Sequence, residues 1–256
     1  MKTKIPHTFV FLTCFIVAAL AISFRNGTVP AVSASVTEGK RTVVIDSGHG
    51  GADGGCVGVN GCVEKDINLA IAKDLEALLK LSGFNVVMTR SEDVSIHSEG
   101  VEGLRNQKVS DMENRLGIIK SYPDAMFISI HQNQYTEPEY FGAQMFYTTN
   151  NTGNFKLAQL MQESFRELQP ENDREIKLID NDLYLFKNTD QPAILAECGF
   201  LSNSNDAANL SDSEYQKKVA FTIYKGVMRY YNSADAANVQ ITGEGNGENE
   251  NILYMQ

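Results

Sequence analysis

Two histidines and two glutamates have the side-chain types needed for metal-dependent chemistry. His49, Glu64, His131 and Glu197 lie far apart in the chain. Imidazole and carboxylate groups together suit zinc, and two histidines with one glutamate leave a fourth, open position in a recognised catalytic arrangement. The residue types therefore indicate a metal site with His49, Glu64 and His131 as ligands and Glu197 as an additional carboxylate.

Three short apolar segments lead into His49, His131 and Glu197, and we predict that all three are strands. Nearly continuous apolar runs are typical of central strands with both faces buried. If the strands are parallel, their carboxyl ends share one edge of the sheet, where ligands bind in open α/β folds. A lone histidine after a strand is more commonly a hydrogen-bonded loop residue, so the prediction depends on the three ends meeting. The segments are 43–45, 126–130 and 193–196.

Glu64 stands at the far end of the glycine-rich loop that begins at His49. This loop can fold back over the same edge of the sheet and bring the carboxylate to the histidines. Spacings this long carry little information by themselves, unlike a contiguous metal-binding motif. The alternative role of Glu64, together with Asp66, is to stabilise the start of a helix through the helix dipole.

Glu197 has two roles that the residues alone do not separate. It can act as the general base on the attacking water and then as an acid toward the leaving amine. It can also be a structural acid in a salt bridge with Arg90 or Arg115.

The remaining pattern predicts a single α/β domain, a mostly parallel twisted sheet with helices on both faces. Helical and strand periodicities alternate along the chain, as in βαβ units. The expected elements are a helix from Glu64 to about Gly83, a strand 85–90, a loop 91–109, a helix 110–120, a strand 143–147, a helix 154–168, a strand 183–186 and a helix 215–231.

The two ends of the chain differ from this domain in composition. Lys2 and Lys4 precede an uncharged run, so residues 1–25 are predicted to be a signal peptide or a membrane anchor, and the protein is expected to be exported. We assign 26–40 to a linker, 41–231 to the catalytic domain and 232–256 to a disordered acidic tail, which has too few apolar residues to pack.

Charge and cysteines limit the partners. A net charge of −10 and a pI near 4.9 argue against nucleic-acid binding.

Cys56 and Cys62 can form a disulfide, bind metal or remain free thiols, because spacing alone does not decide between these states. Cys198 is expected to be a small buried apolar residue, since no activating histidine stands near it in the sequence.

Four blocks of the sequence, in order, resemble the signature blocks of zinc-dependent N-acetylmuramoyl-L-alanine amidases, the amidase_3 group. The resemblance covers about Arg41 to Tyr231 and is far more specific than any one block. The blocks are Ile45-Asp46-Ser47-Gly48-His49-Gly50-Gly51, Glu64-Lys65-Asp66, Ser129-Ile130-His131-Gln132-Asn133 and Glu197-Cys198-Gly199-Phe200-Leu201-Ser202-Asn203.

The resemblance implies that His49, Glu64 and His131 hold Zn²⁺ and that Glu197 is catalytic. It further implies hydrolysis of the amide between N-acetylmuramic acid and the first L-alanine of the peptidoglycan stem peptide. Supporting or substrate-binding positions are implied for Arg90, Arg115 and Asn133.

Other segments, such as Leu183-Tyr184-Leu185, are closer to the germination-specific, spore-cortex branch, which prepares muramic δ-lactam. The protein is then expected at the outer face of the cytoplasmic membrane or in the cell wall or cortex space, where an accessory protein is a further partner. Ser47, Gln134 and Cys198 depart from the usual pattern, and Gln134 is expected to narrow the pocket or alter substrate choice.

Two other functions remain open at the level of the sequence. One is a membrane-tethered domain that binds peptidoglycan or a partner with weak or no catalysis. The other is a zinc carboxypeptidase or deacetylase, which would share the metal chemistry.

Overall fold

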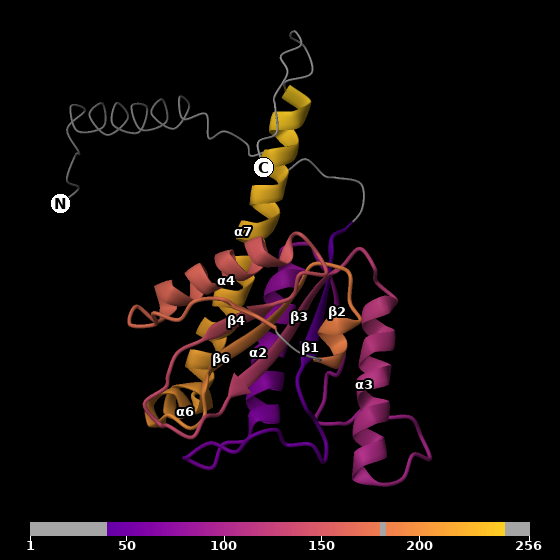
Figure 1. Cartoon of the computed structure of the whole chain (residues 1–256), viewed down its shortest axis with the longest axis vertical. Coiled ribbons are helices and arrows are strands. Elements are labelled where there is room, and N and C mark those ends of the chain that lie inside the picture. The colour runs from indigo at the N-terminus through magenta and orange to yellow at the C-terminus, as the bar shows by residue number, and fades with distance from the viewer. Residues whose placement is uncertain (1–39, 180–182, 244–256) are drawn as a thin grey trace, which may run out of the picture. The chain divides into compact units, whose positions relative to one another are not determined.

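A computed structural model describes residues 40–179 and 183–243 of the chain, with only the backbone given for 235–243. Within these residues the strands form one six-stranded sheet in the order β2-β1-β3-β6-β4-β5 (Figure 1). Every pairing is parallel except that of β4 with β6. The strands are β1 (Thr42–Ser47), β2 (Asn85–Met88), β3 (Met126–Asn133), β4 (Gln144–Tyr147), β5 (Lys177–Leu178) and β6 (Ala193–Phe200).

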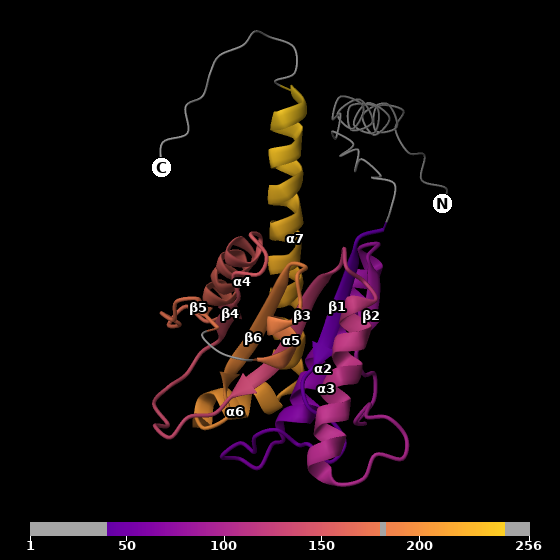
Figure 2. The ribbon, with the colours of Figure 1, turned by 45° about the vertical axis from the view of Figure 1, so that its right-hand side comes forward.

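Helices cover both faces of the sheet, which confirms the predicted α/β architecture. On one face α2, α4 and α7 enclose the larger core, into which Val43 and Ile45 of β1 point. On the other face α3 and α5 enclose a smaller core that contains Val44 (Figure 2). The helices are α2 (Glu64–Leu81), α3 (Leu104–Lys120), α4 (Asn154–Leu168), α5 (Tyr184–Lys187), α6 (Ser204–Ser211) and α7 (Ser213–Gly243).

The three strands predicted to carry the site are parallel neighbours at the centre of the sheet. Asp46 of β1 pairs in register with Ser129 of β3, and His131 of β3 pairs with Glu197 of β6. Alternate residues of a strand point to the same face, and Val44, Phe127 and Leu195 belong to the smaller core. Asp46, Ser129, His131 and Glu197 therefore lie on the face that α3 and α5 cover. Because the strands run in the same direction, their carboxyl ends meet at one edge.

The predicted strand 183–186 is wrong, because this segment forms the short helix α5. Leu185 and Phe186 are both buried in the smaller core. Consecutive residues of a strand point to opposite faces, whereas a helical turn can direct both toward the sheet. The strand that ends the sheet beside β4 is instead β5, which was not predicted.

Two helix boundaries and one further helix also differ from the sequence analysis. α3 begins at Leu104, so it includes part of the predicted loop 91–109. The helix α6 was not predicted, and Asn203 caps it by accepting hydrogen bonds from two backbone N–H groups. α7 continues to Gly243, so residues 232–243 are helical and the prediction of disorder from Asn232 is wrong there. Alanines in this stretch favour extension of a helix that is already formed.

Some of the predictions fall outside the described residues. These are the signal or anchor at 1–25, the linker up to residue 39 and the end of the tail at 244–256. Of the helices in the described part, none has both the length and the apolar character needed to cross a membrane.

Replacing Phe127 by alanine is expected to destabilise the fold by about 3–5 kcal/mol, since the change removes a buried ring and leaves a cavity. Phe127 is fully buried on β3, with its ring centroid 5.2 Å from that of Phe186. Urea unfolding measures the loss. Phe221→Ala is the matched control, because Phe221 is 52% exposed and its loss should cost less than about 0.5 kcal/mol. Equal losses for the two variants would contradict this description of the core.

Candidate active site

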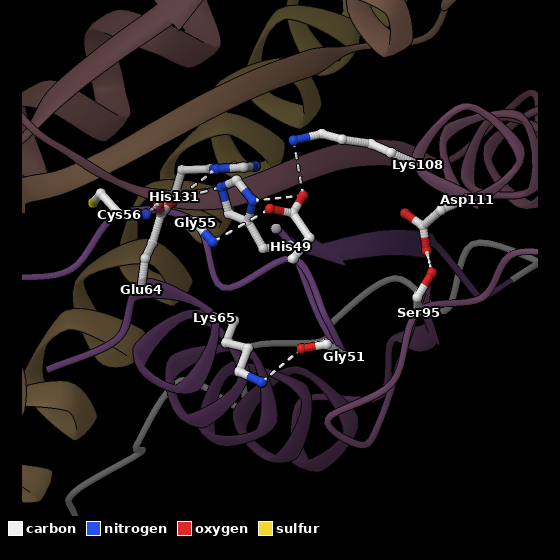
Figure 3. Close-up of polar contacts among 12 residues, drawn as sticks. His49, Gly51, Gly55, Cys56, Glu64, Lys65, Ser95, Lys108, Asp111 and His131 are labelled. Carbon is white, nitrogen blue, oxygen red and sulfur yellow. Dashed lines mark hydrogen bonds and ion pairs between the residues drawn. The ribbon is translucent and has the colours of Figure 1, made fainter. Parts of the chain in front are cut away.

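His49, Glu64 and His131 come together at the carboxyl edge of the sheet. His49 follows β1, His131 lies on β3 and Glu64 is the first residue of α2. One nitrogen or oxygen atom from each lies within 4.8 Å of the others. Figure 3 shows the two rings and the carboxylate turned toward one another. Two imidazoles and one carboxylate at this separation can hold a single metal ion.

The carboxylate of Glu64 is surrounded by N–H groups. Its Oε1 lies 3.0 Å from His131 Nδ1 and accepts a hydrogen bond from the backbone of Gln132. Its Oε2 lies 3.2 Å from His49 Nε2 and accepts a hydrogen bond from the backbone of Cys56. Burial opposes ionisation, but the bonds from His131 and His49 hold the pKa of Glu64 well below its usual range. Glu64 is therefore an anion fixed between the two rings.

Two buried arginines hold the turn that presents His49. Arg90 donates to the carbonyl oxygens of Ser47, at 2.9 Å, and Gly48, at 3.0 Å. Arg115 donates to those of Ser47, at 2.8 Å, and His49, at 2.6 Å. His49 has φ 64, a conformation that residues other than glycine rarely adopt. The arginines fix this backbone, so they support the site through the turn.

Asp46 neutralises Arg115 beneath the turn. Its Oδ1 accepts from Arg115 Nη1 at 2.6 Å and from the Thr89 hydroxyl at 2.8 Å, and its Oδ2 accepts from the Ser129 hydroxyl at 2.7 Å. Burial alone would raise the pKa of Asp46, but the guanidinium of Arg115, the nearby His131 and the two hydroxyls lower it to about 2. The result is a fully bonded ion pair between β1 and α3.

At two positions near the site only glycine leaves enough room for the three groups. A Cβ on Gly48 would lie 2.2 Å from the ring of His131, and one on Gly55 would lie 2.3 Å from Glu64 Oε2. Real side chains do not approach so closely, so these positions must lack a side chain for the three groups to meet.

Glu197 stands beside the three donors with one oxygen unpartnered. In the part of the chain that is described, its buried Oε2 has no hydrogen-bond partner. Burial and, to a lesser degree, the anionic Glu64 raise the pKa of Glu197 to about 7, although His131 and His49 oppose the shift. Within the described residues Glu197 forms no salt bridge with Arg90 or Arg115, since both guanidinium groups bond elsewhere. Glu197 can thus take up and release a proton near neutral pH.

A pocket of about 250 Å³ opens over these groups. Its floor is polar and includes His49, His131 and Glu197, while its wall includes Leu185 and Phe186 of α5. Such a pocket suits a ligand with a polar reacting bond and an apolar body.

Asn133 does not line this pocket. Its side chain accepts a hydrogen bond from the backbone of Gln134 at 2.8 Å, and its carbonyl accepts one from Leu201. It stabilises the irregular pairing that follows His131. Gln134 is exposed and donates to the carbonyl of Val57, so it holds the glycine-rich loop and is not among the residues that line the pocket.

The cysteines of the described residues are free thiols. Cys56 and Cys62 are half-buried, and the Cys56 thiol faces the carbonyl of Gln132. Cys198 is buried in the larger core, as expected for a small apolar residue. Burial raises the pKa of both Cys56 and Cys198, so their thiols stay protonated.

The structure adds three polar residues that the sequence analysis missed. Asn68 donates to Glu64 Oε1 and to the carbonyl of Gly48, both at 3.3 Å. Asp53 and Lys108 also line the pocket. The spacing of Asn68, four residues after Glu64 on one helix face, is the only signal in the sequence that pointed to any of them.

Comparison with families of known proteins gives a match over the part of the chain that carries this site. The family model described as N-acetylmuramoyl-L-alanine amidase matches residues 43–229. The chain belongs to this amidase family. Membership confirms the predicted enzyme class, an amide hydrolase that acts on peptidoglycan.

This amidase also has close relatives of known name. It is 37% identical over 191 residues to the germination-specific N-acetylmuramoyl-L-alanine amidase of Bacillus subtilis, covering 75% of this chain and 80% of the relative. The CwlD amidase from Clostridioides difficile, solved in complex with the GerS lipoprotein, matches with a TM-score of 0.73 and 38% identity, covering 76% of this chain and 100% of that one. The catalytic domain of CwlV from Bacillus (Paenibacillus) polymyxa matches with a TM-score of 0.63 and 30% identity, covering 75% and 98%.

Asp46→Asn is expected to remove an acid-sensitive part of this amidase's stability. The pKa of Asp46 in the folded protein is about 2, below its value of about 4 in an unfolded chain. The ionised carboxylate therefore stabilises the fold above about pH 4, and this contribution is lost as the pH falls toward about 2. Roughly two pKa units correspond to about 2–3 kcal/mol at pH 7 and about half of that at pH 3.

Urea unfolding at pH 7 and pH 3 measures this contribution. The stability difference between Asp46→Asn and the unmodified chain should shrink at the lower pH. Asp124→Asn, at an exposed position in the turn before β3, is the control and should change stability little at either pH. A difference that stays the same at both pH values would contradict the role assigned to Asp46.

Proposed function

We propose that this amidase uses zinc, with His49, Glu64 and His131 as ligands and Glu197 as the group that moves protons. The observation that carries the proposal is the unpartnered Oε2 of Glu197, which lines the same pocket as His49 and His131, beside the three-donor cluster. The bond cleaved is the amide between the lactyl group of N-acetylmuramic acid and L-alanine.

The donor set fits zinc. Two imidazole nitrogens and one carboxylate oxygen are ligands that zinc accepts in catalytic sites with an open fourth position. The anionic Glu64, held by backbone N–H groups and Asn68, is preorganised for a cation. When bound, zinc supplies Lewis acidity that polarises the scissile carbonyl and makes water a stronger acid.

Glu197 would carry the proton between the two halves of the reaction. Its Oε2 accepts a proton from the attacking water, because no other group in the described residues occupies that oxygen. The same oxygen then donates the proton to the amide nitrogen, so that L-alanine leaves as an amine. A pKa near 7 suits a group that must be both base and acid.

The arginines would contribute through geometry. Arg90 and Arg115 hold the carbonyl oxygens of the turn that carries His49, and Asn133 secures the strand end after His131. The apolar wall formed by Leu185 and Phe186 of α5 lines the same pocket as His131 and Glu197. That wall can exclude water from one side of the bound substrate.

The proposed setting is the spore cortex. The germination-specific relative from Bacillus subtilis supports a role in germination. Formation of muramic δ-lactam is the product that the resemblance to the spore-cortex branch implies, and it is part of this proposal. The relative solved with a lipoprotein supports an accessory protein as a partner of this chain. Cleavage of peptidoglycan takes place outside the cytoplasm, so we place the enzyme at the outer face of the membrane or in the cortex space.

Glu197→Gln is expected to lower kcat by about 10²–10⁴-fold, because the glutamine side chain cannot accept the proton of the attacking water. Zinc content should remain unchanged, since Glu197 is not one of the proposed ligands. Mass spectrometry of muropeptides measures the released stem peptide, and metal analysis of the same full-length sample gives the zinc content.

Two further variants complete this test. Glu139→Gln, at an exposed position, is the matched control and should keep full activity. His131→Ala should lose both zinc and activity. Undiminished release of stem peptide by Glu197→Gln would refute the assigned role, and a product with any other new end would refute the proposed bond.

A further inference from the structure

The two ring nitrogens of His49 face two different carboxylates. Nε2 lies 3.2 Å from Glu64 Oε2, on the side of the proposed zinc site. Nδ1 lies 3.1 Å from Asp53 Oδ2, on the side of the solvent. Asp53 belongs to neither the ligand set nor the proton-transfer group described above.

An imidazole that binds a metal through one nitrogen must carry its proton on the other. A carboxylate that accepts this proton in a hydrogen bond fixes both the tautomer and the rotation of the ring. Without such an acceptor, the ring of His49 can place its proton on Nε2, where it blocks the lone pair needed for coordination.

We propose that Asp53 is a positioning residue that accepts the Nδ1–H of His49 and so presents Nε2 to the metal. The inference rests on the proposed zinc site and adds to it a residue outside the ligand set. Asp53 acts through His49 and does not touch the reacting atoms.

The loop after His49 is built to return Asp53 to the ring. The backbones of Gly50 and Asp53 exchange two hydrogen bonds, of 2.8 and 3.2 Å, which close a tight turn. Gly50 and Gly51 have φ values of 137 and 59, which only glycine adopts readily. The turn places a carboxylate four residues after His49 directly against its ring.

Asp53 is itself held from two sides. Lys108 Nζ lies 3.0 Å from Oδ2, and the backbone N–H of Gly55 lies 3.4 Å from Oδ1. Figure 3 shows Lys108 extending from α3 toward the ring of His49. The ammonium group thus keeps Oδ2 in place, within reach of the Nδ1–H of His49.

A surface ion pair with Lys108 is the plainer explanation of Asp53. The side chains are 35% and 61% exposed, and exposed pairs of this kind contribute little to stability. That explanation leaves the 3.1 Å contact with His49 unused. The two explanations differ in what they predict for metal affinity.

The test measures the zinc affinity of the full-length chain by competition with a fluorescent chelator. Asp53→Ala should weaken binding by about 10–100-fold, as for other carboxylates behind metal-binding histidines. Asp53→Asn should weaken it less, because the amide oxygen can still accept the Nδ1–H. Asp93→Ala is the matched control and should bind zinc like the unmodified chain. Asp93 makes comparable loop contacts, with Lys65 at 2.7 Å and the Gly51 backbone at 2.9 Å, but no contact with a proposed ligand.

A second measurement reports on the ring itself. Nitrogen-15 NMR of the zinc-bound chain should show His49 protonated at Nδ1, and the Asp53→Ala chain should lose this single tautomer. Failure of the unmodified chain to bind zinc would refute the proposed function and this inference with it. Zinc binding by the unmodified chain, with equal affinity in Asp53→Ala or equal loss in Asp93→Ala, would overturn this inference alone.

Discussion

The guanidinium group of Arg115 lies buried under the site and holds the turn on which the other parts depend. It bonds to Asp46, to Asp111 and to the carbonyl oxygens of Ser47 and His49. An unpaired buried charge would cost several kcal/mol, but here nearly every donor has an acceptor. The backbone at His49 can therefore remain in a rarely populated conformation, and its ring stays aimed at Glu64.

The position of Glu64 is set by the core. Glu64 begins α2, whose buried residues Ile67, Ile71 and Leu75 pack onto the sheet. A carboxylate at the first turn of a helix is favoured by the helix dipole. The ligand role and the structural role that the sequence left open for Glu64 are thus compatible, because the helix start that favours the anion also directs it to the histidines. A carboxylate mounted on a packed helix has little freedom to move away.

Much of this arrangement followed from the sequence because the central strands are short, apolar and parallel. Continuous apolar runs before His131 and Glu197 predicted buried strands, and parallel strands bring their ends to one edge whatever the intervening loops do. The strand prediction for residues 183–186 was wrong because four apolar residues fit a helical turn as well as a strand. Tertiary contacts, which periodicity does not record, decided that case.

The supporting groups around the ligands were harder to foresee. Asp53 reaches His49 only because a glycine turn reverses the chain, and the need for Gly48 arises from a ring on another strand. Whether Cys56 and Cys62 pair or stay free depends on loop geometry that spacing does not encode, and both are free thiols. Long-range contacts of this kind require the folded backbone.

The central claim is that His49, Glu64 and His131 surround one zinc ion, and zinc K-edge X-ray absorption of the full-length protein tests it most directly. We expect a shell of nitrogen and oxygen at about 2.0–2.1 Å, with outer scattering from two imidazole rings. Cys56 lies beside the site, with its backbone bonded to Glu64, so a sulfur ligand is the natural rival. A sulfur shell near about 2.3 Å, or a spectrum unchanged in His131→Ala, would contradict the account.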